Sequence, residues 1–435
     1  MKYFKNNAGY VLMWILALIP LVIWYFMRPL DIRFGSSGQT LRSLGQLTGL
    51  LGMALLSLNF VLSARFKFLD RWFAGLNNAY VKHHIIGALS FCFLLFHPTF
   101  LFIQYLFISL KASFDFIFSV DNWPIILGEI ALLVFIGLMV ITFYLNFKHE
   151  NWKKTHQYLG LVLFLGGFHM FLVPSDISNN NILKFYMITL AVWGAYAFVY
   201  RTILGVYKKG EFKYRLMEVL KINESVVELK FKPLEESIKF LAGQFVFLRF
   251  DVPGILSESH PFSIASAHKT DLSLGVKALG DYTSMVYLQK PGVVASIEGP
   301  FGAFSYLKAK SKRQIWVAGG IGVTPFLSMA RDIDISKNTG GYEIDFYYSA
   351  KNDKESAFGQ ELVEISAHNP GFKFYQHFSD ISGYISADFI AQNIKDIVSA
   401  EIFLCGPVAF MKSLREQFIK IGFDNRMIHS EEFSF

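Results

Sequence analysis

Long apolar runs fill the first half of the chain and stop near residue 206. Six of these runs have the length of a membrane-spanning helix, and they cover about residues 10–27, 43–63, 84–108, 124–147, 157–173 and 182–203. After residue 213 the runs become short and alternate between apolar and polar positions, which is typical of β-strands. The pattern therefore predicts a membrane-embedded half followed by a soluble half.

The soluble half changes its rhythm once more, near residue 314. Before that point short β-rich segments follow one another, beginning with two alternating segments joined by a polar turn at Asn223–Ser225. After it, strands alternate with glycine-rich turns and helices, and such an order implies a parallel sheet with right-handed crossovers. The expected domains are residues 1–206, 207–310 and 311–435.

Composition and charge agree with this division. Of the 435 residues 53% are hydrophobic and 46 are phenylalanine, which is high for a soluble protein. The formal net charge is +7, with lysine and arginine gathered at alternate connections between the apolar runs. We interpret this charge as an orientation signal and not as a nucleic-acid surface. It predicts a multi-pass protein of the plasma or inner membrane, with both termini and the soluble half in the cytoplasm.

Two further features narrow the class. The run from Tyr10 to Met27 lacks a small-residue cleavage pattern, so we expect a retained first span and not a signal peptide. The two cysteines, Cys92 and Cys405, lie in an apolar run and in the soluble half, which argues against a disulfide framework or a zinc-type cysteine site.

Four histidines lie in or beside two of the apolar runs. His83 and His97 are 14 residues apart, and His156 and His169 are 13 apart. Along a helix this separation is a rise of about 20 Å, and a histidine inside a bilayer is usually functional. Two such helices side by side would form two histidine pairs, one above the other. Each pair is suited to hold a haem iron from both faces.

Helical phase distinguishes the histidines. A spacing of 14 returns to within about 40° of the same helix face, whereas a spacing of 13 misses it by about 140°. His83 is therefore better aligned with His97 than His84 is, and His156 needs tilt, a wide turn or long side-chain reach to join His169. A buried histidine bonded to backbone is the alternative for any one of them, but two spaced pairs favour metal binding.

Two segments of the soluble half suit phosphate groups. Gly319-Gly320-Ile321-Gly322-Val323-Thr324-Pro325 follows an expected strand and opens a helix, where backbone N–H groups attract a diphosphate. Lys277 and the helix start Gly280-Asp281-Tyr282-Thr283 suit a second pyrophosphate, although an ordinary turn and N-cap explain them equally well.

The whole chain resembles the NADPH oxidase and ferric reductase superfamily of transmembrane flavocytochromes. The resemblance rests on motifs in the expected order: His260-Pro261-Phe262-Ser263, Glu298-Gly299-Pro300-Phe301-Gly302, the Gly-x-Gly-x-x-Pro form of the Gly320–Pro325 loop, Cys405-Gly406-Pro407 and the acidic-aromatic end Ile428–Phe435. It implies a six-helix transmembrane bundle, a ferredoxin-NADP reductase-like FAD β-barrel and an α/β nicotinamide-binding domain.

The resemblance also implies roles for single residues. Phe262 and Ser263 would line the flavin, with Ser263 at its reactive edge and His260 toward the FAD phosphates, where many relatives have arginine. Gly299 and Gly302 would lie beside the flavin, and Cys405 would lie where nicotinamide meets it. Phe433, with Phe435 as the alternative, would cover the flavin face. Lys351 would meet the 2′-phosphate of NADPH, although a surface lysine fits as well.

The implied activity is transfer of electrons from cytoplasmic NAD(P)H through FAD and two b haems to an outer acceptor. Oxygen, giving superoxide, is the expected acceptor, with ferric chelates or quinones as alternatives. Arg28, Arg33 and Arg42 on the outer side would pair with haem propionates or anionic acceptors if they are not simply solvated. A transporter or channel with a nucleotide-sensing domain is the rival class, but it leaves the four histidines unexplained. No obligate protein partner is indicated.

Overall fold

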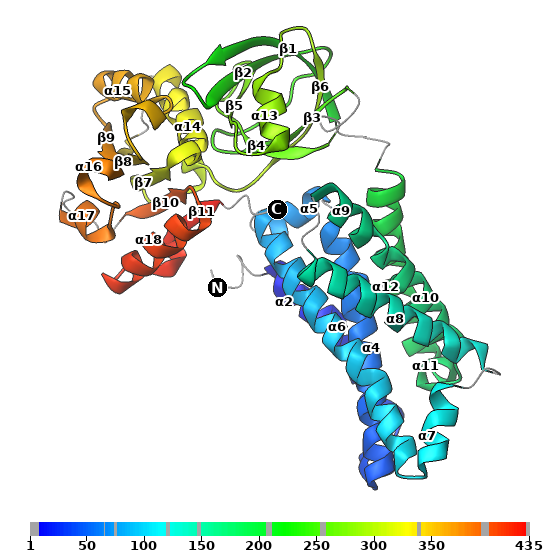
Figure 1. Cartoon of the computed structure of the whole chain (residues 1–435). Helices are drawn as coiled ribbons and strands as arrows, with labels where there is room; N and C mark the ends of the chain where they lie inside the picture. Colours follow the sequence, from blue (N-terminus) through cyan, green and yellow to red (C-terminus); the bar gives the residue numbers. More distant parts are fainter. Residues whose placement is uncertain are drawn as a thin grey trace. The chain divides into compact units, whose positions relative to one another are not determined.

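The structure is a computed structural model of the chain (Figure 1). It describes residues 8–64, 66–73, 76–118, 122–145, 149–205, 211–252, 258–336, 341–392 and 400–431. The chain forms two compact units, Met1–Tyr207 and Lys208–Phe435. This boundary lies one residue beyond the expected end of the membrane half. The finer division at residue 310 stays a prediction.

The first unit is helical (Figure 1). Its longer helices are α2 (Ala8–Met27), α4 (Ser37–Ser63), α6 (Leu76–Leu106), α8 (Trp123–Tyr144), α10 (Leu159–Leu172) and α12 (Asn181–Phe198), the last continued by a π-helix over Val199–Ile203. Shorter helices connect them: α3 (Leu30–Phe34), α5 (Lys67–Trp72), α7 (Leu110–Ile117), α9 (His149–Gln157) and α11 (Asp176–Asn179).

Within the described residues, five helices are long and apolar enough to cross a membrane: Ala8–Met27, Ser37–Ser63, Ala79–Leu106, Trp123–Tyr144 and Asn181–Ile203. The run expected at 157–173 forms α10, which has 14 residues. Such a helix is about 21 Å long, shorter than the roughly 30 Å hydrocarbon core of a bilayer. Five of the six expected spans are therefore present at full length, and the sixth crossing stays a prediction.

Helix α4 lies at the centre of the helical unit. Of its most apolar window 67% is buried, against 11% for α6 and 22–28% for the other spanning helices. Gly45, Gly49 and Gly52 recur at helical spacing along α4, and a Cβ on Gly49 would lie 2.7 Å from the His97 ring. Small residues at such positions allow membrane helices to approach closely. The glycine face therefore brings α4 against the helix that carries two of the histidines.

The second unit begins with a six-stranded antiparallel sheet in the order β4-β3-β6-β1-β2-β5. Its strands are β1 (Glu211–Lys221), β2 (Val226–Pro233), β3 (Phe245–Phe250), β4 (His260–Ser263), β5 (Leu272–Lys277) and β6 (Val294–Phe301), with helix α13 over Asp281–Tyr287. Asn223 Oδ1 accepts hydrogen bonds from the N–H groups of Ser225 and Val226, at 3.0 and 2.9 Å. This Asx turn reverses the chain between β1 and β2, as the polar turn predicted.

The edges of this sheet approach each other. An isolated antiparallel bridge joins Ile264, just after β4, to Leu274 of β5. The expected β-barrel is thus represented by a six-stranded sheet with a bridge between its edges, and full closure stays a prediction.

The rest of the second unit is a five-stranded parallel sheet in the order β11-β10-β7-β8-β9. Its strands are β7 (Arg313–Gly319), β8 (Glu343–Ala350), β9 (Phe372–Phe378), β10 (Glu401–Cys405) and β11 (Ile428–Glu431). Its helices are α14 (Thr324–Ser336), α15 (Gly359–His368), α16 (Ser379–Ser382), α17 (Ala387–Gln392) and α18 (Val408–Lys420). The helices predicted near 325–335, 358–367 and 408–421 are confirmed as α14, α15 and α18. The strand order reverses between β7 and β10, and open α/β sheets bind ligands at such a switch point.

Candidate functional site

Four histidines face one another in two pairs inside the helical unit. The ring centres of His83 (α6) and His156 (α9) are 6.2 Å apart, with an angle of 68° between the ring planes. The ring centres of His97 (α6) and His169 (α10) are 6.3 Å apart, with an angle of 70°. The structure therefore brings together all four histidines that the spacing predicted.

Backbone carbonyls fix three of these rings. The Nδ1 atoms of His83, His97 and His169 lie 3.2, 2.7 and 2.8 Å from the carbonyl oxygens of Asn59, Gly45 and Pro124. Because a carbonyl only accepts hydrogen bonds, Nδ1 carries the proton and Nε2 keeps its lone pair. This is the tautomer that binds a metal through Nε2. The fourth ring, His156, stacks on Trp152 with ring centres 5.0 Å apart.

A break in the helix resolves the phase mismatch of the second pair. Helix α9 ends at Gln157 and α10 begins at Leu159, with Tyr158 between them at ψ −9°. A regular helix has ψ near −42°, so the turn at Tyr158 rotates His156 relative to His169. His84 is exposed, with its ring 5.6 Å from that of His83. His83 is thus the residue of α6 that faces His156.

Glycines make room for the His97–His169 pair. A Cβ on Gly49 would lie 2.7 Å from Nδ1 of His97, and one on Gly128 of α8 would lie 2.6 Å from Nδ1 of His169. Both distances are shorter than a Cβ tolerates, so any larger side chain would displace the ring. The sequence analysis did not single out these glycines, because a glycine facing a ring on another helix leaves no local signal.

Arg33 differs from the expectation of an arginine available to a ligand. Arg33 is only 4% exposed, and its guanidinium lies 3.0 Å from the Asp176 carboxylate and 3.5 Å from the ring centre of Trp24. The Nη2 atom donates to the carbonyl of Trp24 at 2.9 Å. The charge of Arg33 is therefore already compensated by the protein, and the residue fastens α3 to α11.

The His-Pro-Phe-Ser motif forms edge strand β4. His260, Pro261 and Phe262 are half-buried, whereas Ser263 is buried. Tyr282 of α13 stacks on His260 with ring centres 3.8 Å apart, and lies 6.3 Å from Phe262 in a nearly parallel orientation. Tyr282 is buried, whereas the His260 and Phe262 rings stay partly accessible at the sheet edge, where a planar ring system can pack on them.

The segment Gly280–Thr283 begins helix α13, as predicted. Thr283 Oγ1 accepts hydrogen bonds from the N–H groups of Leu279 and Gly280, at 2.9 and 3.0 Å. Thr283 therefore caps the helix itself and uses two N–H groups that the expected pyrophosphate would otherwise bind. Lys277 ends β5 and lies 3.5 Å from Glu355. Phosphate binding by Lys277, Gly280, Asp281, Tyr282 and Thr283 stays a prediction.

The glycine-rich loop lies at the switch point of the parallel sheet. Strand β7 ends at Gly319, residues Gly320–Val323 form a 3₁₀ turn, and α14 begins at Thr324. Gly320 has φ +54°, and an added Cβ would have no atom within 4 Å. A Cβ on Gly322 would instead lie 2.5 Å from the carbonyl oxygen of Cys405. Gly320 thus borders open space, whereas Gly322 packs against the end of β10.

Two other residues of the loop serve packing through their side chains. Thr324 and Pro325 are both buried. Thr324 Oγ1 donates to the carbonyl of Ile321 at 2.9 Å, and its methyl group occupies the space that a Cβ on Gly275 would need. Gly275 belongs to β5, so this contact joins the loop to the antiparallel sheet.

The Cys405-Gly406-Pro407 motif lies on the opposite side of the switch point, at the end of β10. Cys405 ends β10, opposite Glu431 of β11, and its thiol donates to the Glu431 carbonyl at 3.8 Å. Burial raises the pKa of this thiol, so it stays protonated at neutral pH. The backbone of Gly406 packs on that of Gly319, and Pro407 precedes α18. The ends of the two central strands are therefore in direct contact.

Glu431 connects this point to the antiparallel sheet. The residue is 4% exposed, and a Cβ on Gly302, which has φ +96°, would lie 2.6 Å from Glu431 Oε1. Glycine is favoured at Gly302, because φ +96° strains any other residue and a Cβ would require the Glu431 carboxylate to shift. Gly299 also has positive φ, at +151°. The Glu298–Gly302 turn, which the resemblance places beside the flavin, thus contacts the end of β11.

Of the three remaining site residues, the structure describes Lys351. Lys351 directly follows β8 and is exposed. Phe433 and Phe435 lie outside the described residues. Their expected roles stay predictions.

Three families match consecutive parts of the chain. Residues 48–167 match the ferric reductase like transmembrane component, residues 211–305 match an FAD-binding domain, and residues 316–416 match the oxidoreductase NAD-binding domain.

Individual relatives match shorter parts. The glycine betaine monooxygenase reductase subunit of Chromohalobacter salexigens is 28% identical over 209 residues, which are 45% of this chain and 56% of that protein. Flavohemoprotein A of Dictyostelium discoideum is 31% identical over 146 residues, which are 33% of this chain and 36% of that protein. The chain thus spans about half or less of these relatives. A flavohemoglobin structure from Malassezia yamatoensis aligns with TM-score 0.48 and 18% identity, over 78% of this chain and 94% of that one.

The order of the three family matches agrees with the two units and their motifs. An apolar helical unit with five spanning helices in its described residues precedes an FAD-binding and a nicotinamide-binding region. The protein is therefore a multi-pass membrane oxidoreductase that uses flavin and NAD(P)H, and it belongs to the superfamily with NADPH oxidase and ferric reductase-like architecture.

Proposed function

We propose that the protein moves electrons from NAD(P)H through FAD and two b-type haems to an acceptor on the opposite side of the membrane. The observation that carries this proposal is the arrangement of four histidines as two facing pairs at two levels of the helical unit. A structural role for the histidines would require no common ring spacing. The distances between ring centres in the two pairs differ by only 0.1 Å, at 6.2 and 6.3 Å.

The ring spacing fits one iron between each pair. A metal–imidazole bond is about 2.0 Å and the ring centre lies about 1.2 Å further, so two opposed rings have centres about 6.4 Å apart. The observed 6.2 and 6.3 Å agree with this value. No group of three or more His, Cys, Asp or Glu able to hold a metal occurs in the described residues. Two axial histidines suffice when a porphyrin supplies the other ligands.

Backbone carbonyls of the chain orient the histidine ligands. The carbonyls at Asn59, Gly45 and Pro124 orient three rings and keep the proton on Nδ1. In the second unit, His260 and Phe262, backed by the Tyr282 ring, would hold the flavin, and the loop around Gly320 would hold the NAD(P)H diphosphate. When bound, FAD would supply the conversion of a hydride into single electrons, and the haems would supply one-electron carriers within the membrane.

The charge pattern supports an orientation of the chain in the membrane. The positive-inside bias supports a cytoplasmic second unit, so the His83–His156 pair is the inner pair and the His97–His169 pair is the outer pair. Oxygen, giving superoxide, is the proposed acceptor, and ferric chelates or quinones are the alternatives. Phe433, or Phe435, would cover the flavin, and Lys351 would favour NADPH.

Turnover of purified protein with cytochrome c tests the acceptor. Reduction that superoxide dismutase abolishes identifies oxygen as the acceptor. Reduction that persists with the dismutase, and transfers to a ferric chelate or a quinone, assigns the alternative. A visible spectrum without b-type bands would contradict the electron path and favour the transporter or channel class.

Replacing Gly128 by alanine is expected to displace the His169 ring. The new Cβ would lie 2.6 Å from Nδ1, so the ring must move and its bond to the Pro124 carbonyl lengthens. The expected result is a changed reduction potential, or loss, of one of two haems in a spectroelectrochemical titration. Gly137→Ala on the same helix is the matched control, because its Cβ would meet no atom within 4 Å. Identical titrations of both variants would contradict the assignment of His169.

A further inference from the structure

One face of helix α14 binds the antiparallel sheet through polar groups. Ser328, Arg331 and Asp332 recur at helical spacing and so share a face. Ser328 Oγ donates to the carbonyl of Ser266 at 2.6 Å, and Asp332 Oδ1 accepts from the N–H of His268 at 3.0 Å. These partners follow β4 directly. Helix α14, which begins at the glycine-rich loop, is thus attached to the segment that follows β4, the strand of the His-Pro-Phe-Ser motif.

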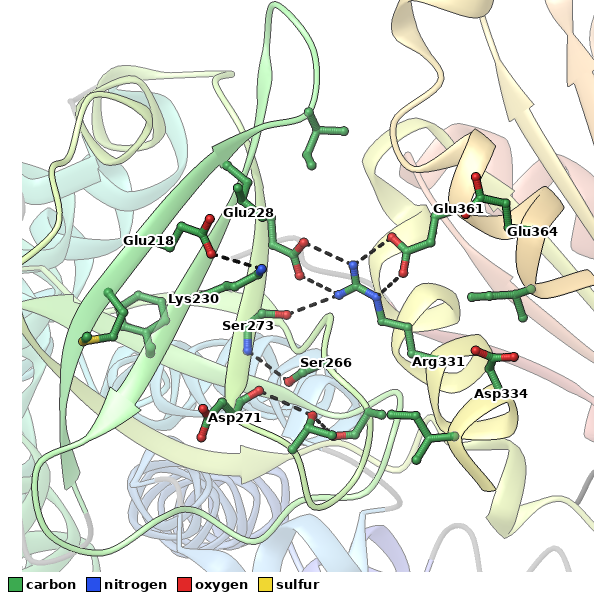
Figure 2. A pocket seen from close by; sticks show the side chains of 18 of the residues that line it. Glu218, Glu228, Lys230, Ser266, Asp271, Ser273, Arg331, Asp334, Glu361 and Glu364 are labelled. Atoms are coloured by element: carbon green, nitrogen blue, oxygen red, sulfur yellow. Dashed lines mark hydrogen bonds and ion pairs between the residues drawn. The ribbon is translucent and has the colours of Figure 1, made fainter. Parts of the chain in front are cut away.

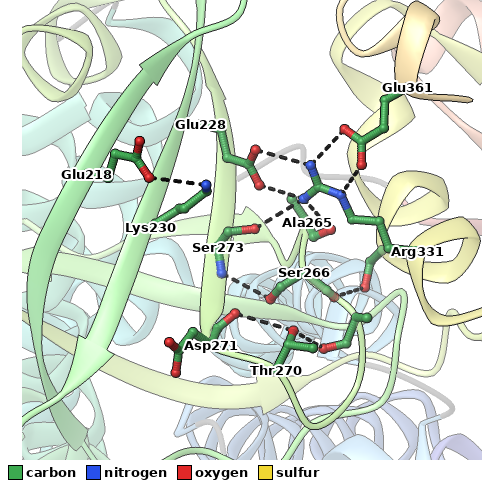
Figure 3. Close-up of polar contacts among 12 residues, drawn as sticks. Glu218, Glu228, Lys230, Ala265, Ser266, Thr270, Asp271, Ser273, Arg331 and Glu361 are labelled. Carbon is green, nitrogen blue, oxygen red and sulfur yellow. Dashed lines mark hydrogen bonds and ion pairs between the residues drawn. The ribbon is translucent and has the colours of Figure 1, made fainter. Parts of the chain in front are cut away.

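Arg331 is the centre of this attachment (Figure 3). Its guanidinium binds both carboxylate oxygens of Glu228 on β2, at 2.5 and 3.1 Å, and both of Glu361 on α15, at 2.6 and 2.8 Å. It also donates to the carbonyl of Ala265 at 3.1 Å and to Ser273 Oγ at 3.4 Å. The planar fork of arginine matches two carboxylates at once, which lysine cannot do.

The two carboxylates lie in different regions of the second unit. Glu361 and Arg331 both lie in the nicotinamide region, so their ion pair connects α14 to α15 only. Glu228 belongs to the flavin region, and its side chain is 3% exposed against 36% for Glu361. Burial acts to raise the pKa of Glu228, but the bonds from Arg331 outweigh it and lower that pKa. The Glu228–Arg331 ion pair therefore connects the two regions in a buried place.

A cleft lies beside this ion pair (Figure 2). It has a volume of about 900 Å³ and is lined on one side by β1, β2 and β5 and on the other by α14 and α15. Arg331 crosses from one wall to the other. Open space thus separates the flavin region from the nicotinamide region at this cleft, and the Glu228–Arg331 ion pair connects its two walls.

We propose that Arg331 is a positioning residue for hydride transfer: held by Glu361 within the nicotinamide region, it binds Glu228 of β2 and so fixes the nicotinamide region relative to the flavin region. The inference rests on the proposed transfer of a hydride from NAD(P)H to FAD in the second unit. Helix α14 transmits the constraint, because its first turn carries the glycine-rich loop and its third turn carries Arg331. A change at Arg331 therefore shifts the bound nicotinamide without touching it.

Glu228→Gln in the full-length protein is the central test. The variant removes the charge from the buried link between the regions, while Arg331 keeps Glu361 and the neutral acceptors on Ala265 and Ser273. The limiting rate of flavin reduction at saturating NAD(P)H, measured by stopped flow, is expected to fall about 10-fold, because small misplacements of reacting atoms slow transfer strongly. FAD content and nucleotide Kd are expected to stay close to those of the wild type. The long-wavelength charge-transfer absorbance of nicotinamide stacked on flavin should weaken in parallel.

Three variants separate positioning from folding. Glu228→Asp keeps the charge on a shorter arm and should recover part of the lost rate. Glu361→Gln removes the partner within the nicotinamide region and should change the limiting rate less. Glu218→Gln is the matched control, because Glu218 pairs with Lys230 at 3.1 Å in the same cleft but within the flavin region.

The outcomes distinguish this inference from the proposed function. No flavin reduction by NAD(P)H in the wild type would refute the function itself. A wild-type rate in Glu228→Gln, or an equal loss in Glu361→Gln, would refute the positioning role alone. If Glu228→Gln loses FAD, Glu228→Asp decides. Retained FAD with flavin reduction slower than in the wild type supports positioning, whereas loss of FAD in this variant as well assigns the effect to folding and overturns the inference.

Discussion

Replacing His97 by alanine is expected to leave the purified protein with one haem per chain instead of two. His97 supplies one of two opposed rings, and its Nδ1 bond to the Gly45 carbonyl fixes the direction of Nε2. Without that ring, His169 alone faces the position of the iron. Loss of a residue that merely supports a metal ligand lowers affinity or activity roughly 10–100-fold. Loss of the ligand itself is expected to exceed this effect.

Haem counting by pyridine haemochrome, with turnover of an outer acceptor, measures the result. Flavin reduction by NAD(P)H should persist in His97→Ala, because the second unit is unchanged, while acceptor reduction should be lost. His84→Ala is the control, since its ring is exposed and does not belong to either pair. Two haems in His97→Ala, or one haem in His84→Ala, would contradict the pairing.

The alignment of His83 with His97 was predictable because both residues lie on one helix, whereas His156 and His169 lie on two helices, α9 and α10. Residues 14 apart return to nearly the same face, so His83 and His97 could be aligned without knowing the fold. The turn at Tyr158 was not predictable in position, since it depends on how α9 and α10 pack on their neighbours. Gly49 and Gly128 were missed for a related reason. Their role exists only when another helix places a ring against them.

In the second unit, the succession of strands and helices along the chain was predictable to within a few residues, because hydrophobic period and glycine-rich turns are local. The Glu228–Arg331–Glu361 cluster was not predicted, since its members are separated by 103 and 30 residues along the chain. Glu228 is a charged residue within the buried stretch of β2. A charged residue at an inward position requires a partner, but only the fold identifies Arg331.

The role of Gly322 also changes once the fold is known. As a nucleotide contact it would have to stay small for the diphosphate. In the structure an added Cβ would lie 2.5 Å from the carbonyl oxygen of Cys405 and 2.6 Å from the N atom of Gly406. Both are backbone atoms at the end of β10, which is paired with β7 along its length. Neither side of the contact is able to move independently.

Gly322→Ala is therefore expected to destabilise the second unit, and not only to weaken nucleotide binding. Overpacking of this kind costs about 2–3 kcal/mol, which in a unit of 228 residues lowers Tm by roughly 4–12 °C. Thermal unfolding of the full-length protein, with hydrogen exchange of β7 and β10, measures the effect. Faster exchange should be concentrated at the ends of these two strands.

Gly320→Ala is the comparison that separates the two roles. Its φ of +54° adds about 1 kcal/mol of backbone strain for an alanine, but its Cβ would meet no atom within 4 Å. That open space is where a diphosphate would approach the loop. Gly320→Ala should therefore raise the KM for NAD(P)H while Tm changes little. If Gly322→Ala keeps its Tm and raises KM instead, the β10 backbone yields to the new Cβ, and Gly322 is the nucleotide contact that its motif predicts.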